Sequence, residues 1–183
     1  MKRDREEDSD EEESRKTKRD KKKDKKKKME NEFLKACRTG KLKVVQSLIR
    51  EGIDVAAEKE DGRSAIILAA ENGHVDVVNV LLENGADVND VLKTKWTDLH
   101  LGALNGHIDL VEVLIQHGAD VNALTEQNNA AIHIAEHVDI VKVLIKNGAD
   151  IHALGQYEFT ALHNASRRGN VDIVNVLLEN GAD

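Results

Sequence analysis

After residue 30, apolar residues recur in short blocks with the period of an α-helix. Between residues 74 and 87 the apolar side chains that share one helical face are Val77, Val78, Leu81 and Leu82. A shorter apolar block, Ser64–Gly73, precedes this one, and Gly85 follows it where helices commonly end in a left-handed residue. The pattern predicts a short helix, a longer amphipathic helix and then an extended turn.

This unit repeats along the chain. The triplet Gly-Ala-Asp begins at residues 85, 118, 148 and 181, at intervals of 33, 30 and 33 residues, with a degenerate copy at residue 52. A fixed period of this length is typical of a solenoid. We expect an all-α repeat domain over residues 30–183, with five repeats at approximately 31–57, 58–90, 91–123, 124–153 and 154–183, and a separate tail over residues 1–29.

Several motifs recur in phase with this period. They are HVDVVNVLLENGADVN from residue 74, Thr97-Asp98-Leu99-His100 and Thr160-Ala161-Leu162-His163. These motifs resemble ankyrin repeats. The resemblance implies stacked helix–turn–helix units joined by β-turn fingers, and a non-catalytic scaffold or adaptor that binds a protein on the concave face of fingers and first helices.

The chain departs from the family pattern in its fingers. Proline is absent from the second position of every four-residue motif, at Ala65, Asp98, Ala131 and Ala161. The finger glycine is present at Gly62 but is replaced by Lys95, Asn128 and Glu158. A residue other than glycine in a left-handed conformation costs roughly 1–2 kcal/mol. We therefore expect these three fingers to adopt a different turn.

The fourth copy is three residues short, so its first helix, or the turn after it, should lose about one turn, and this copy should be locally the least stable. The deletion creates the sequence His133-Ile-Ala-Glu-His137, whose H-x-x-E-H spacing also occurs in a class of zinc peptidases. His133 is in register with His100 and His163, however, which favours a structural role. No phosphate loop or nucleophile motif occurs, so we expect no catalytic residue, metal ion or cofactor.

Aromatic residues are scarce, and three of the four lie in the fingers. Aromatic side chains are enriched where proteins bind one another. The finger positions proposed to bind a partner are Arg63, Trp96, Asn129, Tyr157 and Phe159. The alternative is that the rings fold back and stiffen the fingers that lack Gly and Pro.

The tail has no apolar side chain to bury between residues 2 and 28, which predicts disorder. It carries seven acids in residues 6–13 and eleven bases in residues 15–28. The basic run is a candidate nuclear-import signal, comprising Lys18, Arg19, Lys21, Lys22, Lys23, Lys25, Lys26, Lys27 and Lys28. The alternatives are a solubilising tail, or an arm that gives a chromatin or nucleic-acid regulator its electrostatic affinity while the repeats recruit a partner.

The remaining hypotheses concern modification, location and partners. Ser9 precedes three acids, as in sites that casein kinase 2 phosphorylates, and the family resemblance makes Asn89 and Asn122 candidates for asparaginyl hydroxylation in an animal host. Cys37 should be a buried thiol, because it aligns with Ala70. No apolar run approaches a membrane helix, so we expect an intracellular protein of the nucleus or cytoplasm.

The charge and the last repeat bear on what binds the repeats. Residues 31–183 hold 13 basic and 23 acidic residues, a net charge of −10 that favours a partner with a basic patch. Residues 171–179 nearly duplicate the internal residues 75–83. An internal-type repeat leaves apolar surface open at an end. We therefore expect further repeats or self-association at this end.

Overall fold

The computed structural model describes the backbone of residues 3–183 and the side chains of residues 19–183. Within that part the chain is helical, with two isolated β-bridges, Glu58 to Ser64 and Val91 to Thr97. The helices are α1 (Arg3–Arg38), α2 (Leu42–Arg50), α3 (Ala65–Ala70), α4 (Val75–Glu83), α5 (Asp98–Asn105), α6 (Ile108–Gln116), α7 (Ala131–Ile134), α8 (Val138–Lys146), the 3-10 turn η1 (Gln156–Glu158), α9 (Ala161–Arg168) and α10 (Val171–Glu179).

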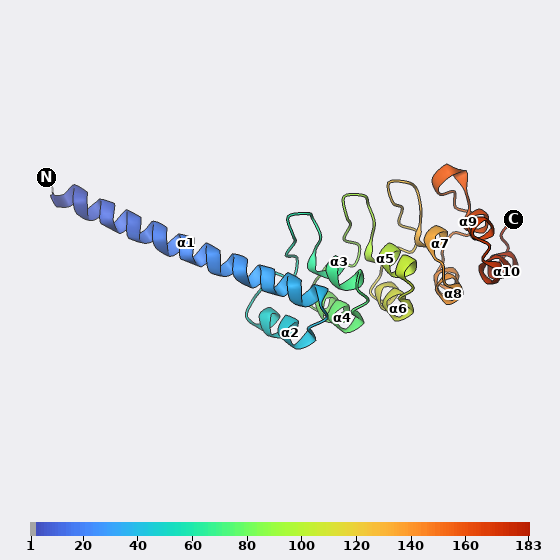
Figure 1. The fold of residues 1–183 in the computed structure, drawn as a ribbon, viewed down its shortest axis with the longest axis horizontal. Helices are drawn as coiled ribbons and strands as arrows, with labels where there is room; N and C mark the ends of the chain where they lie inside the picture. Colours follow the sequence, from blue (N-terminus) through green and yellow to red (C-terminus); the bar gives the residue numbers. More distant parts are fainter. Residues whose placement is uncertain (1–2) are drawn as a thin grey trace.

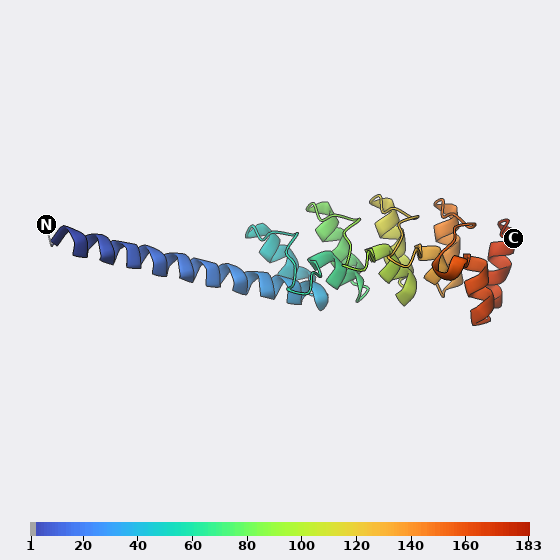
Figure 2. The ribbon, with the colours of Figure 1, turned by 90° about the horizontal axis from the view of Figure 1, so that it is seen from above.

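The helices form two layers that run along the length of the molecule (Figure 1). The end of α1 stacks on α3, and α5, α7 and α9 continue this inner layer, while α2, α4, α6, α8 and α10 form the outer layer. The loops that precede α3, α5, α7 and α9 stand out as fingers on one side (Figure 1), and the helix pairs follow one another as separate tiers when seen from above (Figure 2). The predicted solenoid fold is confirmed.

The apolar stripe of each outer helix holds the two layers together. In α4 the predicted stripe is buried at Val77, Val78 and Leu81, and α6 and α8 bury the three equivalent residues. In the inner layer, all six residues of α3 are buried, and so are the first six of α5, Asp98–Ala103. Each tier thus buries its apolar surface against its neighbours, as a solenoid requires.

The fingers of Gly62, Lys95 and Asn128 share one turn, so the expectation of a different turn is wrong for Lys95 and Asn128. The finger of Glu158 does differ, because Tyr157 before it is also left-handed, with φ 63°. The backbone is left-handed at Gly62, Lys95, Asn128 and Glu158, with φ between 58° and 82°. In every finger one hydrogen bond closes the hairpin; in the finger of Trp96, the Leu92 N–H donates to the Trp96 carbonyl at 2.9 Å. This bond and the stacked neighbours therefore hold Lys95 and Glu158 in a conformation that costs each roughly 1–2 kcal/mol.

In the fourth repeat the deletion shortens the inner helix, which is one of the two places that the sequence left open. Helix α7 has four residues where α5 and α9 have eight. Ala135 then turns to extended backbone, and His137 caps α8. When the third, fourth and fifth repeats are aligned, Leu104 of α5 and Arg167 of α9 occupy the same position, and the fourth repeat has no residue there. The inner layer therefore lacks its last turn in this repeat.

The tail forms the first part of α1, and residues 19–28 pack no side chain into the repeats, in keeping with the prediction of a disordered tail. The side chains of residues 19–28 are exposed, and burial begins with the half-buried Met29 and the buried Phe33. The reasoning behind the prediction, that this segment has nothing to bury, therefore holds for residues 19–28. Their helix depends on local propensity and on side-chain pairs such as Lys26 with Glu30 at 3.6 Å. Among the described residues, no helix is long and apolar enough to cross a membrane.

Candidate partner-binding surface

The finger aromatics lie beside the inner-layer histidines of their own repeats. The ring of Trp96 is tilted at 52° against His100, with 5.8 Å between centroids, and Phe159 is stacked on His163 at 5.4 Å. Both aromatic residues are half-buried. Tyr157 meets the edge of Phe159 at 6.3 Å but is 76% exposed. The rings therefore stiffen the fingers and also leave an aromatic surface open to a partner.

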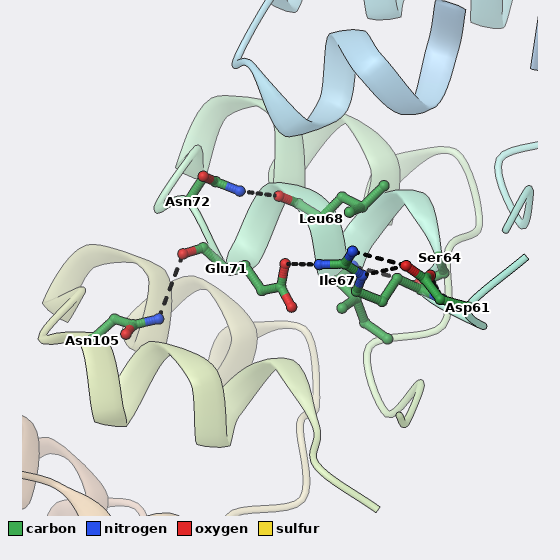
Figure 3. Close-up of polar contacts among 8 residues, drawn as sticks. Asp61, Ser64, Ile67, Leu68, Glu71, Asn72 and Asn105 are labelled. Carbon is green, nitrogen blue, oxygen red and sulfur yellow. Dashed lines mark hydrogen bonds and ion pairs between the residues drawn. The ribbon is translucent and has the colours of Figure 1, made fainter. Parts of the chain in front are cut away.

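Arg63 is held by carboxylates of its own repeat. Its guanidinium lies between Asp61 (Nη2 to Oδ2, 2.8 Å) and Glu71 (Nη1 to Oε2, 3.2 Å), and the dashed lines in Figure 3 mark these contacts. The hydrogen bond with Asp61 is the main reason that the pKa of Arg63 is raised and the pKa of Asp61 is lowered. The pair of carboxylates fixes the finger to α3, so the Arg63 charge is already neutralised.

Asn129 is a link between two fingers. It is 9% exposed, and its side-chain Oδ1 accepts a hydrogen bond from the backbone N–H of Gln156 at 3.0 Å. Its backbone carbonyl accepts from His100 Nε2 at 2.9 Å. Of the five proposed binding residues, Arg63 and Asn129 are thus engaged within the chain, while Trp96, Tyr157 and Phe159 form the aromatic surface.

Two inner-layer histidines, His100 and His133, contact the backbone at the finger that follows their own repeat. The Thr97 N–H donates to His100 Nδ1 at 3.2 Å, so the proton of the neutral ring lies on Nε2, which donates to Asn129. Burial is the main reason that the pKa of His100 is lowered. His133 likewise lies 2.9 Å from the carbonyl of Ala153 through Nε2. These contacts confirm the structural role expected of His100 and His133, whereas His163 is exposed and bonds to Thr160 of its own repeat.

The spacing H-x-x-E-H does not fall on one helix. His133 is buried in α7, whereas His137 precedes α8 and packs over Gly106. His107 packs in the same way over Gly73, where a Cβ would lie 2.8 Å from the ring. Among the described residues, no group of three or more His, Cys, Asp or Glu side chains could hold a metal ion. The short repeat thus brings together two histidines that belong to different stacking positions.

A recess lies on the finger side of the stack, beside the shortened helix. Its volume is about 220 Å³, and we call it the α7–α9 recess. The residues that line it are Trp96, Gln127, Asn129, His133, Ile134, Gln156, Tyr157, Asn164, Arg167 and Arg168. Arg168 reaches across to α7, where its Nη1 donates to the His133 carbonyl at 3.4 Å and its Nε lies 3.7 Å from Glu136 Oε1. Sequence reasoning missed both arginines, although their place beside a three-residue deletion is visible in the sequence.

The modification candidates remain predictions. Asn89 Oδ1 accepts from the Asp120 N–H at 2.9 Å and Asn122 Oδ1 accepts from the Asp150 N–H at 2.8 Å, so both exposed side chains tie one repeat to the next. The side chains of Ser9 and Lys18 lie outside the described residues. The other import candidates, Arg19 and Lys21 to Lys28, are exposed.

Two further expectations concern apolar groups. Cys37 is fully buried, and burial raises the pKa of its thiol to about 12, as expected for an unreactive core cysteine. At the other end of the stack, Val171 is 66% exposed and Leu178 is 51% exposed. The outer side of α10 therefore presents an open apolar face.

The described part of the chain is thus a helical solenoid with an aromatic, recessed finger side. The chain matches the sequence model of a family described as ankyrin repeats (3 copies), over residues 33–125 and again over residues 99–183. These matches span most of the chain, which belongs to the ankyrin-repeat family. Ankyrin repeats are generally protein–protein interaction modules and typically non-catalytic. No curated protein sequence matches the chain.

Proposed function

We propose that this chain is a non-catalytic scaffold or adaptor that binds a protein partner on its finger side. The observation that carries the proposal is the exposed ring of Tyr157, which lines the α7–α9 recess together with Trp96. Aromatic anchors beside a pocket are the usual centres of binding energy in protein interfaces. The rigid stacking of Phe159 on His163 lowers the entropic cost of presenting this surface.

The charge of the repeats favours a partner with a basic patch. The net charge of −10 over residues 31–183 would steer such a partner toward the stack. Association should slow as salt is added, because long-range attraction is screened at physiological ionic strength. The tail would then set the location of the protein or add a second electrostatic contact.

The test compares proteins captured from the native cell by three forms of the full chain. The wild type and the control variant Lys142→Ala, which changes an exposed residue of α8, should retain the same specific partner. The double variant Trp96→Ala, Tyr157→Ala should lose it. Equal capture of that partner by all three forms would contradict binding on the finger side.

The exposed basic run of the tail supports a second candidate, a nuclear regulator that contacts chromatin or nucleic acid. Residues 19–28 present eight Lys or Arg side chains, which would contact phosphates without reading the base sequence. Removal of residues 1–29 should then abolish binding to DNA or RNA at physiological salt. Fused to a passive reporter in a nucleated cell, residues 1–29 should also move it into the nucleus. A diffuse reporter would leave the tail as a solubiliser.

A further inference from the structure

The α7–α9 recess differs in charge from the rest of the stack. Two arginines line it and no Asp or Glu does, although the repeats carry a net charge of −10. Arg168 is already paired with Glu136 at 3.7 Å. Arg167 is exposed and makes no ion pair with any side chain of residues 19–183. The recess therefore offers one unneutralised guanidinium.

The shape of the recess follows from the short repeat. The inner helices α5 and α9 continue for a turn beyond the point where α7 ends, so Arg167 stands next to an empty position of the inner layer. Trp96 and Tyr157 form aromatic walls, and Gln156 and Asn164 add amide groups. A carboxylate beside Arg167 would find a charged fork, amide donors and partial exclusion of water, the conditions in which charge-assisted hydrogen bonds are strong.

The surroundings of the recess have the opposite charge. Glu126 and Glu158 are exposed on the fingers that carry Gln127 and Tyr157, but neither lines the recess. A ligand segment would therefore meet negative charge at the finger tips and positive charge inside. This alternation favours one acidic residue between basic neighbours.

We infer that the α7–α9 recess binds a single Asp or Glu side chain of the partner, which lies in a basic segment and pairs with Arg167. The inference rests on the proposed function and names the chemistry of the partner at that surface. A basic segment would be attracted by the net negative charge of the repeats, and its one acidic residue would pair with Arg167.

The single tryptophan of the chain makes the recess directly observable, since Trp96 gives one indole fluorescence signal and one indole N–H resonance. The probes are two capped pentapeptides, GKEKG and GKQKG, titrated to millimolar concentrations into the full chain. The glutamate peptide should shift the indole resonance and bind about tenfold more tightly than the glutamine peptide, the difference expected for one charge-assisted contact.

Variants separate the charge from the fold. Arg167→Gln should remove the preference for glutamate, while Lys142→Gln on α8 should keep it. Equal shifts from the two peptides, no shift from either, or a preference that survives Arg167→Gln would overturn the inference. Inorganic phosphate is a further probe, and tighter binding of phosphate than of the glutamate peptide would assign the recess to another ligand. If the Trp96→Ala, Tyr157→Ala variant still loses its partner, the proposed function stands even where this inference fails.

Discussion

Arg168 donates from Nη1 to the carbonyl oxygen of His133 at 3.4 Å, across the gap between α9 and the shortened α7. The last carbonyls of a helix have no partner within it, and α7 ends one turn early. The arginine of the fifth repeat therefore supplies a donor to the fourth and lies beside Glu136 at 3.7 Å. The missing turn is partly replaced by a side chain from the next tier.

Replacement of Arg168 should loosen the fourth repeat. We expect Arg168→Ala to lower the free energy of unfolding by about 1 kcal/mol, the usual contribution of one hydrogen bond with a partly exposed ion pair. Hydrogen exchange should accelerate more in residues 131–146 than in residues 65–83. Arg167→Ala is the matched control and should leave both rates unchanged, because Arg167 has no ion pair in the described part of the chain.

Asp98 is a buried carboxylate whose two oxygens have no hydrogen-bond partner among the described residues. Burial, followed by the charges of Asp90, Glu71 and Asp87, raises its pKa well above the ordinary value. Asp98 is the first residue of α5, and Thr97 before it is extended (φ −94°, ψ 169°), as the residue before a proline must be. We expect Asp98→Pro to stabilise the fold by about 1–3 kcal/mol at neutral pH, because it removes the buried acid.

The sign of the pH dependence follows from the raised pKa of Asp98. The stability that the protonated carboxyl provides is fully present below the unfolded pKa of about 3.9 and is lost as pH rises through the folded pKa. The free energy of unfolding of the wild type relative to Asp98→Asn should therefore fall with rising pH above about 4. Chemical denaturation of both proteins across the acid and neutral range measures this difference, and a constant difference would contradict it.

Lys95 and Glu158 hold a left-handed backbone that glycine adopts without strain. Lys95→Gly and Glu158→Gly should each raise the free energy of unfolding by about 1 kcal/mol, after the entropic cost of glycine is subtracted. Asn128→Gly should have a smaller effect, since asparagine tolerates this conformation better than other residues. Thermal unfolding of the three variants checks the order, and Gly62→Ala should lower the melting temperature.

The open apolar face of α10 should promote association between molecules. Val171 and Leu178 are exposed there, whereas the equivalent Val75 and Leu82 are half-buried inside the stack. Sedimentation over a concentration series should show self-association of the wild type. Leu178→Lys should reduce it, because the lysine side chain replaces apolar surface with a hydrated charge. A wild type that stays monomeric at every concentration, as the variant does, would count against this role for α10.

The spacing of apolar residues along the chain was enough to predict the tiers, because Val77, Val78 and Leu81 share a face of any α-helix that includes them. It was not enough for the fingers, where a hairpin bond and stacked neighbours outweigh the local cost at Lys95. Arg63 and Asn129 occupy equivalent positions of their repeats, yet Asp61 and Glu71 hold Arg63 within its own repeat, whereas Asn129 bonds to Gln156 of the next finger, 27 residues away. The α7–α9 recess was missed because it arises from a turn that the chain lacks.

The shortened α7 also has a mechanical meaning. A solenoid under tension parts at the tier whose inner helix offers the fewest residues to its neighbours, and the fourth tier has four inner residues where its neighbours have eight. Pulling on the two ends of the stack would therefore open it first around α7, with the Arg168 contact as a latch. A ligand seated between Trp96 and Tyr157 would span that same joint and raise the force needed to open it.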